Sequence, residues 1–355
     1  MSFKVLYKIL GIVILSIIIL GVLKGTTVMP NEKDNGFNRN WKSNEGLELE
    51  RSMKFDEPLS TIAGISKNTI FLAGDNATAI LLIDKKSFKR KDTLMIQFHP
   101  DPTKIVPFSI RIDTPYYFVQ FVNLRAYLYG KFPNENIKLK EKAELPFTKS
   151  IQIDSSKVIL RMFNQKGTGQ DFAILDLESM EVKRDTDYVK MYDKTAGMST
   201  DGSFTFDKET KRIFFVEYFR NKFYCMDTSI SLQYIGKTID TVATSRIELK
   251  SMEKNDTTIK LVSAAARLQV NKDCFAGEGL LYILSGMRAS NETIKDFNSH
   301  FVIDYYDQKD GKYLGTVKIP KMEDRKYKSI YVKDGRLYVL YENEFRSYLL
   351  PQIKN

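Results

Sequence analysis

The sequence predicts an all-β protein: a six-bladed β-propeller at residues 45–355, closed by its own N-terminal strand and preceded by one N-terminal transmembrane helix. Three observations predict this architecture. Short apolar strands of similar shape recur six times, the last unit stops after three strands, and an uncharged apolar run stands near the start of the chain. Four antiparallel strands per unit, repeated in series, are the pattern of a propeller. We predict three parts: a membrane helix at 1–24, a flexible tether at 25–44 and the propeller.

Each predicted unit begins with two strands joined by a tight polar turn, and a third and usually a fourth strand follow. The second strands are the most regular, and they lie at 70–74, 117–121, 158–162, 213–217, 281–285 and 337–341. The turns before them contain Asp, Asn, Ser and Gly, as in the "KDG" of residues 333–335, and tight turns favour these residues. The repeat length varies because the loops differ in length.

The last unit lacks an outer strand. The chain ends "SIYVKDGRLYVLYENEFRSYLL", which reads as three strands, whereas the strand-like "GLELERSMKFD" (46–56) precedes the first unit. A propeller must pair its first and last strands, because open strand edges expose unpaired N–H and C=O groups. We expect residues 46–56 to pair with the strand around Glu344–Leu350 and so to close the ring.

The repeated strands of residues 46–355 resemble the bacterial six-bladed propellers of the TolB-like and NHL-like kind. The resemblance rests on the strand pattern, because the chain contains no WD dipeptide, kelch glycine pair or other blade signature. It implies an architecture and leaves the activity open, since one fold supports many functions.

The N-terminal segment is the clearest local signal. An uncharged apolar run extends from Ile9 to Leu23, with Lys4 and Lys8 before it and Lys24 after it. No small-residue cleavage motif follows, which favours an uncleaved signal-anchor over a signal peptide. The leading positive charges place the N-terminus in the cytoplasm. We expect a single-pass protein of the inner membrane with its propeller in the periplasm; the alternative is secretion to the periplasm after cleavage.

Composition narrows the function classes. The net charge is +10, but acidic residues are interspersed among the basic ones and no aromatic–basic motif of a nucleic-acid module is present, so we expect no nucleic-acid partner. Two histidines exclude a His-rich metal site. Cys225 and Cys274 stand in apolar strand contexts, which favours buried free thiols; a disulfide between them is the alternative.

Loop lengths predict the working face. The connections from the second to the third strand of a unit, and from one unit to the next, are the long ones, and binding sites concentrate on long loops held by a rigid scaffold. Arg161 and Arg288 end second strands, Arg220 lies in the loop that follows another, and Gln165 lies in the glycine-rich "NQKGTGQ". We predict that these four residues bind an anionic ligand, because guanidinium groups suit anions.

The opposite face carries short turns, and substitutions there, for example at Lys85 or Lys333, are expected to be tolerated. Candidates for metal ligands are Asp75, Asn76, Glu217 and Glu342, which stand at or just after the ends of second strands; oxygen ligands of this kind suit Ca²⁺. Ordinary polar strand ends are the competing explanation. The sequence identifies no catalytic residues and no cofactor.

Two functions fit this sequence. The first is a membrane-tethered extracytoplasmic propeller that acts as a binding or assembly module in the cell envelope, with an envelope protein or an anionic ligand as its partner. The second is a propeller enzyme, either a metal-dependent hydrolase or lactonase or a subunit of a periplasmic oxidoreductase. We favour a binding protein over an enzyme, because an enzyme requires a converging catalytic set and the sequence presents none.

Overall fold

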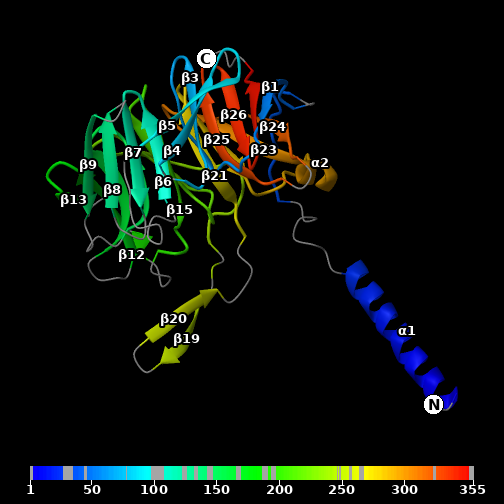
Figure 1. The fold of residues 1–355 in the computed structure, drawn as a ribbon. Helices are drawn as coiled ribbons and strands as arrows, with labels where there is room; N and C mark the ends of the chain where they lie inside the picture. Colours follow the sequence, from blue (N-terminus) through cyan, green and yellow to red (C-terminus); the bar gives the residue numbers. More distant parts are fainter. Residues whose placement is uncertain are drawn as a thin grey trace.

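The computed structural model describes most of the chain. The described residues are 3–26, 35–43, 46–76, 78–96, 108–121, 126–131, 135–141, 147–164, 169–185, 191–192, 197–245, 247, 249–255, 258–263, 268–322 and 325–351. The described strands form a six-bladed β-propeller, which confirms the all-β propeller part of the prediction (Figure 1).

Each blade is an antiparallel sheet whose strands pair in chain order. Blade 1 consists of β2 (Thr61–Ile65), β3 (Thr69–Ala73), β4 (Ala79–Asp84) and β5 (Lys89–Met95), and blade 2 consists of β6 (Phe108–Asp113), β7 (Tyr116–Phe121), β8 (Ala126–Lys131) and β9 (Glu135–Glu141). Blade 3 consists of β10 (Phe147–Gln152), β11 (Lys157–Phe163), β12 (Gly169–Asp176) and β13 (Val182–Asp185), and the short β14 (Met191–Tyr192) also pairs with β12. Blade 4 consists of β15 (Gly202–Asp207), β16 (Arg212–Glu217), β17 (Phe223–Met226) and β18 (Leu232–Gly236), and blade 5 consists of β21 (Asn271–Gly277), β22 (Leu280–Ser285), β23 (His300–Asp307) and β24 (Tyr313–Pro320). Blade 6 consists of β25 (Tyr327–Lys333), β26 (Arg336–Tyr341), β27 (Glu344–Leu349) and β1 (Leu49–Lys54).

The N-terminal strand closes the ring, as predicted. β1 pairs antiparallel with β27, and Met53 lies opposite Phe345 in the register. Arg336 at the start of β26 reaches across β27 to Glu50, with Nε 2.6 Å from Oε2. The first strand of the propeller is therefore the outer strand of its last blade.

The hydrophobic core lies between neighbouring blades rather than at one centre. Six clusters of buried apolar residues each join two adjacent blades. The cluster at the closing joint contains Leu72 of blade 1 and Leu340 of blade 6, and Met53 and Phe55 from the closing segment pack against it. Innermost strands approach closely: a Cβ at Gly64 would stand 2.1 Å from the carbonyl oxygen of Ile112. The blades depend on one another for burial.

The prediction of a flexible tether is corrected in part, because residues 35–43 pack against blade 5. Phe37 is buried, and Arg39, which is 4% exposed, forms ion pairs with Glu292 and Asp304. Burial alone would lower the pKa of the Arg39 guanidinium, but these carboxylates raise it above its usual value. Trp41 forms a parallel bridge with Thr316 on the outer strand of blade 5. Residues 27–34 of the predicted tether lie outside the described residues.

Helix α1 (Phe3–Thr26) stands apart from the propeller (Figure 1). Its described side chains, from Leu10 to Val22, are all exposed, and most are apolar. Within the described part of the chain, no helix meets the length and apolarity that crossing a membrane requires.

Two elements lie in long loops of the propeller. The hairpin of β19 (Leu249–Asn255) and β20 (Thr258–Ser263) lies between blades 4 and 5, and α2 (Ile294–Ser299) lies between β22 and β23. Thr293 caps α2, because its hydroxyl accepts a hydrogen bond from the N–H of Asp296. Figure 1 shows that the hairpin and α1 extend on the side of the ring opposite the C-terminus.

The two cysteines are buried and free, as expected. Burial raises the pKa of the Cys225 thiol to about 11. The Cys274 sulfur lies 3.2 Å from the hydroxyl of Ser203 on the neighbouring blade. Both thiols therefore act as small apolar core groups.

Removing the closing strand tests the ring. A chain that starts at Leu59 should unfold at lower temperature and elute as aggregated or expanded material. It loses ladder hydrogen bonds worth about 0.5–1.5 kcal/mol each, and it uncovers the apolar cluster at the joint. A chain that starts at Asn35 is the control, and it should melt like the full chain. Thermal melting and size-exclusion chromatography compare the two, and equal behaviour would show that β1 does not stabilise the ring.

Candidate functional site

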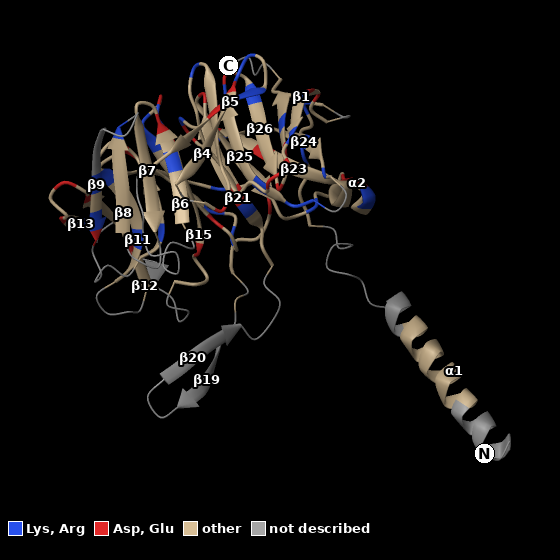
Figure 2. Ribbon diagram, viewed as in Figure 1, with Lys and Arg blue, Asp and Glu red and all other residues tan. Residues whose placement is uncertain are grey.

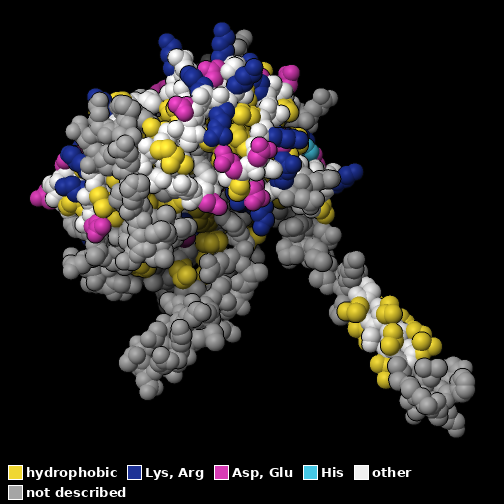
Figure 3. Space-filling view, in the orientation of Figure 1, with side chains coloured by type: hydrophobic (Ala, Val, Ile, Leu, Met, Phe, Trp, Pro, Cys, Tyr) yellow, Lys and Arg dark blue, Asp and Glu magenta, His cyan; other side chains and the backbone are white. Residues whose placement is uncertain are grey.

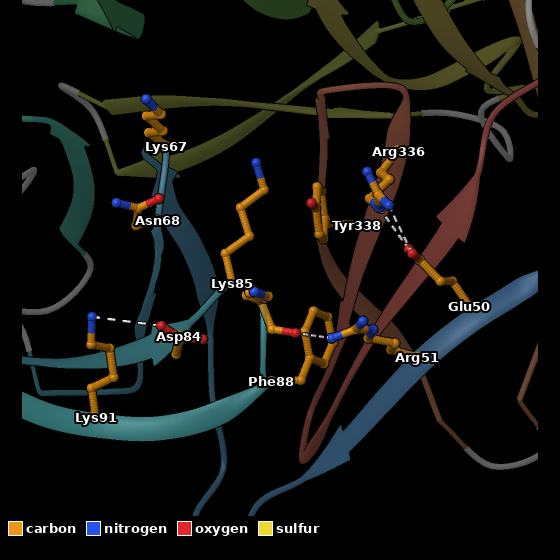
Figure 4. A pocket seen from close by; sticks show the side chains of 11 residues that line it. Glu50, Arg51, Lys67, Asn68, Asp84, Lys85, Phe88, Lys91, Arg336 and Tyr338 are labelled. Carbon is orange, nitrogen blue, oxygen red and sulfur yellow. Dashed lines mark hydrogen bonds and ion pairs between the residues drawn. The ribbon is translucent and has the colours of Figure 1, made fainter.

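A hollow lies at the joint between blades 6 and 1, and we call it the seam pocket. Its volume is about 530 Å³. The lining residues come from β1, the β2–β3 turn, the end of β4, the β4–β5 turn, β5 and β26. They are Glu50, Arg51, Lys67, Asn68, Asp84, Lys85, Lys86, Phe88, Lys91, Arg336 and Tyr338 (Figure 4). Residues from the two ends of the chain therefore build one site.

Hydrogen bonds in two turns of blade 1 fix one wall of the seam pocket. The carboxylate of Asp84 accepts a hydrogen bond of 2.7 Å from the N–H of Ser87, and the N–H of Lys85 donates to the carbonyl of Asn68. Phe88 adopts a left-handed φ of 56°, which turns the chain into β5. The Phe88 ring stacks on Phe345 of β27, at 5.4 Å between centroids. The wall is thus packed directly against the closing blade.

The seam pocket is strongly basic. Six of its lining residues are Lys or Arg and two are carboxylates. The hydrogen bond from Arg336 lowers the pKa of Glu50, and hydrogen bonds from Ser87 lower that of Asp84. Both acids are therefore ionised at neutral pH, yet each already has a basic neighbour: Arg336 for Glu50, and Lys91, 3.6 Å away, for Asp84.

The basic groups differ in how they are held. Arg51 donates to the carbonyl of Lys86 and lies 5.8 Å from the centre of the Phe88 ring, and Lys85 pairs with Asp334. In contrast, the ammonium groups of Lys67 and Lys86 have no ion-pair partner among the described residues. The pocket thus combines fixed guanidinium groups with two uncompensated ammonium groups, an arrangement that suits an anion.

The seam pocket opens on the face of the short turns. Figure 2 shows Lys and Arg positions at this end of β26, and Figure 3 shows dark blue side chains protruding there, on the side of the C-terminus. Lys85, at which a substitution was expected to be tolerated, lines this pocket and pairs with Asp334, and its tolerance stays a prediction.

The central channel opens on the same face but differs in character. Its inner part, about 340 Å³, is lined mainly by apolar side chains such as Ile62, Phe204 and Phe275. Its mouth mixes charges of both signs, for example Lys208 and Asp113, which pair at 2.7 Å. The mouth therefore lacks the excess positive charge of the seam pocket.

The three arginines that were predicted to bind an anion contact other groups of the protein in the structure. Arg161 is 1% exposed, and it donates to the carbonyl of Gly197 at 2.6 Å and to the hydroxyl of Thr200. Arg220 forms an ion pair with the fully buried Glu217. Arg288 donates to backbone carbonyls, including that of Glu292. Gln165 lies outside the described residues.

Two of these arginines share one neighbourhood. The Tyr224 hydroxyl donates to Glu217 at 2.9 Å, and the charges of both Arg161 and Arg220 act on Tyr224. Burial, and then Glu217, raise the pKa of this phenol. Arg288 belongs to the separate contact of blade 5 with residues 35–43, where its carbonyl accepts a hydrogen bond from Asn35. Ligand binding by these arginines remains a prediction.

The weak metal candidates do not form one site in the described structure. Asp75 accepts a hydrogen bond from Ser60, and Asn76 shapes its own turn by accepting from Thr78. Glu342 is exposed in blade 6, whereas Glu217 is held by Arg220 in blade 4. Among the described residues, no group of three or more His, Cys, Asp or Glu side chains is placed to hold a metal ion.

Sequence reasoning missed the seam pocket because it weighed loop length alone. The basic run "KKSFKRK" (85–91) was visible, as was "ELERSMK" (48–54) in the closing strand. Ring closure, once predicted, places these two segments on adjacent blades. Combining the charge runs with the closure would have pointed to the joint.

Comparisons with known proteins support the fold. No protein-family model matches this chain, and no curated protein does. Among solved structures, a member of the DUF4221 family from Bacteroides vulgatus aligns with 89% of this chain and 98% of its own, at 17% identity and a TM-score of 0.56. Virginiamycin B lyase from Staphylococcus aureus aligns with 84% of this chain and 99% of its own, at 10% identity and a TM-score of 0.48. At 17% identity the likeness to the DUF4221 structure shows the propeller fold alone, and the TolB-like or NHL-like assignment stays a prediction.

Replacing Arg161 tests whether it is a structural group. Arg161→Ala should lower the free energy of unfolding by at least about 1.5–3 kcal/mol, the contribution of one hydrogen bond to a charged group. Arg90→Ala is the matched control, because Arg90 is exposed and its contact with Glu57 is 3.6 Å long; it should stay within about 0.5 kcal/mol. Denaturant unfolding measures both. An unchanged stability in Arg161→Ala would contradict the structural role and would favour the ligand-binding prediction.

Proposed function

We propose that the protein is a membrane-attached β-propeller that binds an anionic ligand in the seam pocket. One observation carries this proposal: six basic side chains surround a hollow of about 530 Å³ in which both carboxylates already have basic neighbours. The ligand is a small molecule or glycan that carries phosphate, sulfate or carboxylate groups. This is a binding role in the cell envelope, with no chemical step assigned.

The size of the pocket and the arrangement of its charges support a ligand with more than one anionic group. Lys67 stands on the β2–β3 turn and Lys86 on the β4–β5 turn, whereas Arg51 and Arg336 stand on the closing blade. A single ion cannot contact both walls of so large a hollow. Two or more anionic groups on one molecule can, and the fixed guanidinium groups lose little freedom when they bind.

The sequence and exposure of α1 support membrane attachment. Its apolar side chains between Leu10 and Val22 are exposed around the helix, and a helix that is apolar on all sides is normally buried in protein or in a membrane. Lys4 and Lys8 precede the apolar run, which favours a cytoplasmic N-terminus and a periplasmic propeller. An enzymatic role remains the alternative hypothesis, and no described cluster favours it.

Anion binding is tested with inorganic pyrophosphate, which carries two phosphate groups. The double variant Lys67→Ala/Lys86→Ala should weaken binding by about tenfold or more, because each lost ammonium removes a charge-assisted contact. Binding should also weaken with added salt. Isothermal titration calorimetry on the full chain in detergent measures the affinities.

The control for this experiment is Lys309→Ala/Lys312→Ala. These exposed lysines lie in the β23–β24 turn on the same face, so the change in net charge is equal. The control should bind like the unmodified protein, and both variants should melt normally. An equal loss in both would indicate nonspecific attraction and would contradict a site at the seam.

Membrane attachment is tested by fractionation. The full chain should sediment with membranes and resist a high-salt wash, whereas a chain that starts at Asn35 should stay soluble. N-terminal sequencing of the isolated protein distinguishes the alternatives. A mature N-terminus beyond Leu23 would show that the segment is a cleaved signal peptide.

A further inference from the structure

A second cavity lies inside the propeller, between blades 2 and 3, and we call it the interblade cavity. Its volume is about 150 Å³. Most of its wall is apolar and includes Ile110, Phe118, Val119, Leu128 and Val158. This cavity is separate from the seam pocket, because the two share no lining residue.

Three polar atoms at this cavity have no hydrogen-bond partner among the residues that the structure describes. They are the amide nitrogen Nε2 of Gln120, the hydroxyl of Tyr127 and the amide oxygen Oε1 of Gln152, and all three atoms are buried. Tyr127 as a residue is 4% exposed. The other halves of the two amides are engaged: Gln120 Oε1 accepts from Ser150, and Gln152 Nε2 donates to the carbonyl of Asp154.

Buried polar groups without partners are costly, and native proteins satisfy nearly all of them with protein atoms or with an occupant of the adjoining space. Here the unmet groups comprise an amide donor, an amide acceptor and a phenol hydroxyl that can serve as either. They line one cavity together. The cavity is therefore equipped to hold a molecule that supplies the missing partners.

The spacing of these groups suits one small molecule. Ser150 and Gln152 are two residues apart on β10, so their side chains leave the same face of the strand about 7 Å apart. Gln120 is bonded to Ser150, so its amide lies near the Ser150 end of that span. The donor of Gln120 therefore lies toward the Ser150 end of this span, and the acceptor of Gln152 lies toward its other end.

Water alone fits this cavity poorly. A volume of this size corresponds to about five water molecules, and each ordered water needs two to four polar partners. The walls are mainly apolar, and within the described part of the chain three atoms lack a partner. An apolar protein cavity of about 150 Å³ is known to accommodate benzene, so one six-membered ring is the appropriate size.

We propose that the interblade cavity binds a small uncharged planar molecule, the size of one six-membered ring, with a hydrogen-bond acceptor and a donor at opposite ends. The acceptor of this molecule accepts a hydrogen bond from Nε2 of Gln120, and its donor donates one to Oε1 of Gln152. The hydroxyl of Tyr127 forms a third hydrogen bond with it. The apolar walls contact the ring faces. No carboxylate lines the cavity within the described structure, and its one charged lining residue, Arg111, donates a hydrogen bond of 2.9 Å to the carbonyl of Gln152.

The probe is 4-pyridone, an uncharged ring with a carbonyl and an N–H at opposite ends. Isothermal titration calorimetry on the full chain in detergent should show saturable binding. Tyr127→Phe, which removes one hydroxyl, and Gln152→Leu, which removes the acceptor, should each weaken binding by about tenfold, and pyridine should bind more weakly than 4-pyridone. Tyr116→Phe is the matched control, because Tyr116 is exposed on the same blade and lies outside the cavity.

Two results would overturn the proposal. The first is the absence of saturable 4-pyridone binding to the unmodified protein, which would mean that water occupies the cavity. The second is binding that neither Tyr127→Phe nor Gln152→Leu changes, which would place the probe elsewhere. Two variants are used so that a folding defect in one of them, detected by thermal melting, leaves the other to decide.

Discussion

The pairing of β1 with β27 is the contact on which the rest of this propeller depends. Each blade buries its apolar side chains against its two neighbours, so the core is a ring of six interfaces rather than one centre. Such a ring has no independent half: if one joint opens, both flanking blades lose a covered face and one blade exposes an unpaired strand edge. The protein closes this joint with the chain segment that is farthest from β27 in the sequence of the propeller.

The same closure builds the seam pocket. Arg51 and Glu50 come from β1, whereas Lys67, Lys85 and Lys86 come from the turns of blade 1, so the pocket does not exist until the ring has closed. Its walls are held by backbone ladders and by the stacking of Phe88 on Phe345, and rigid walls reduce the entropy lost on binding. Residues 35–43 continue this fastening onto blade 5 through Arg39, whose two carboxylate partners are buried with it. The N-terminal segment that precedes blade 1 therefore contacts two blades, blade 5 through Arg39 and blade 6 through β1.

Some of these features were accessible from the sequence and others were not. Strand alternation and turn residues predicted the blades, and the missing outer strand predicted the closure, because both follow from local pattern and from the need to pair strand edges. The packing of residues 35–43 was missed because Arg39 stands in the polar stretch "NGFNRNWKSN", and its partners Glu292 and Asp304 are remote in the chain. The contacts of Arg161 could not be predicted from the sequence for the same reason. Its position at the end of a strand indicated that it lies near a loop, but its contacts with Gly197 and Thr200 depend on the neighbouring blade.

By itself, the sequence determined the strand repeats, the order of the blades and the segment that closes the ring, because periodicity and turn chemistry are local properties of the chain. Tertiary structure alone decided which charged groups are buried and which are available. Arg161 and Arg39 form ion pairs with carboxylates inside the protein. Lys67 and Lys86, in contrast, line a hollow and have no ion-pair partner among the described residues. Burial and pairing are set by residues brought together from distant parts of the chain, and a local pattern carries no information about that distance.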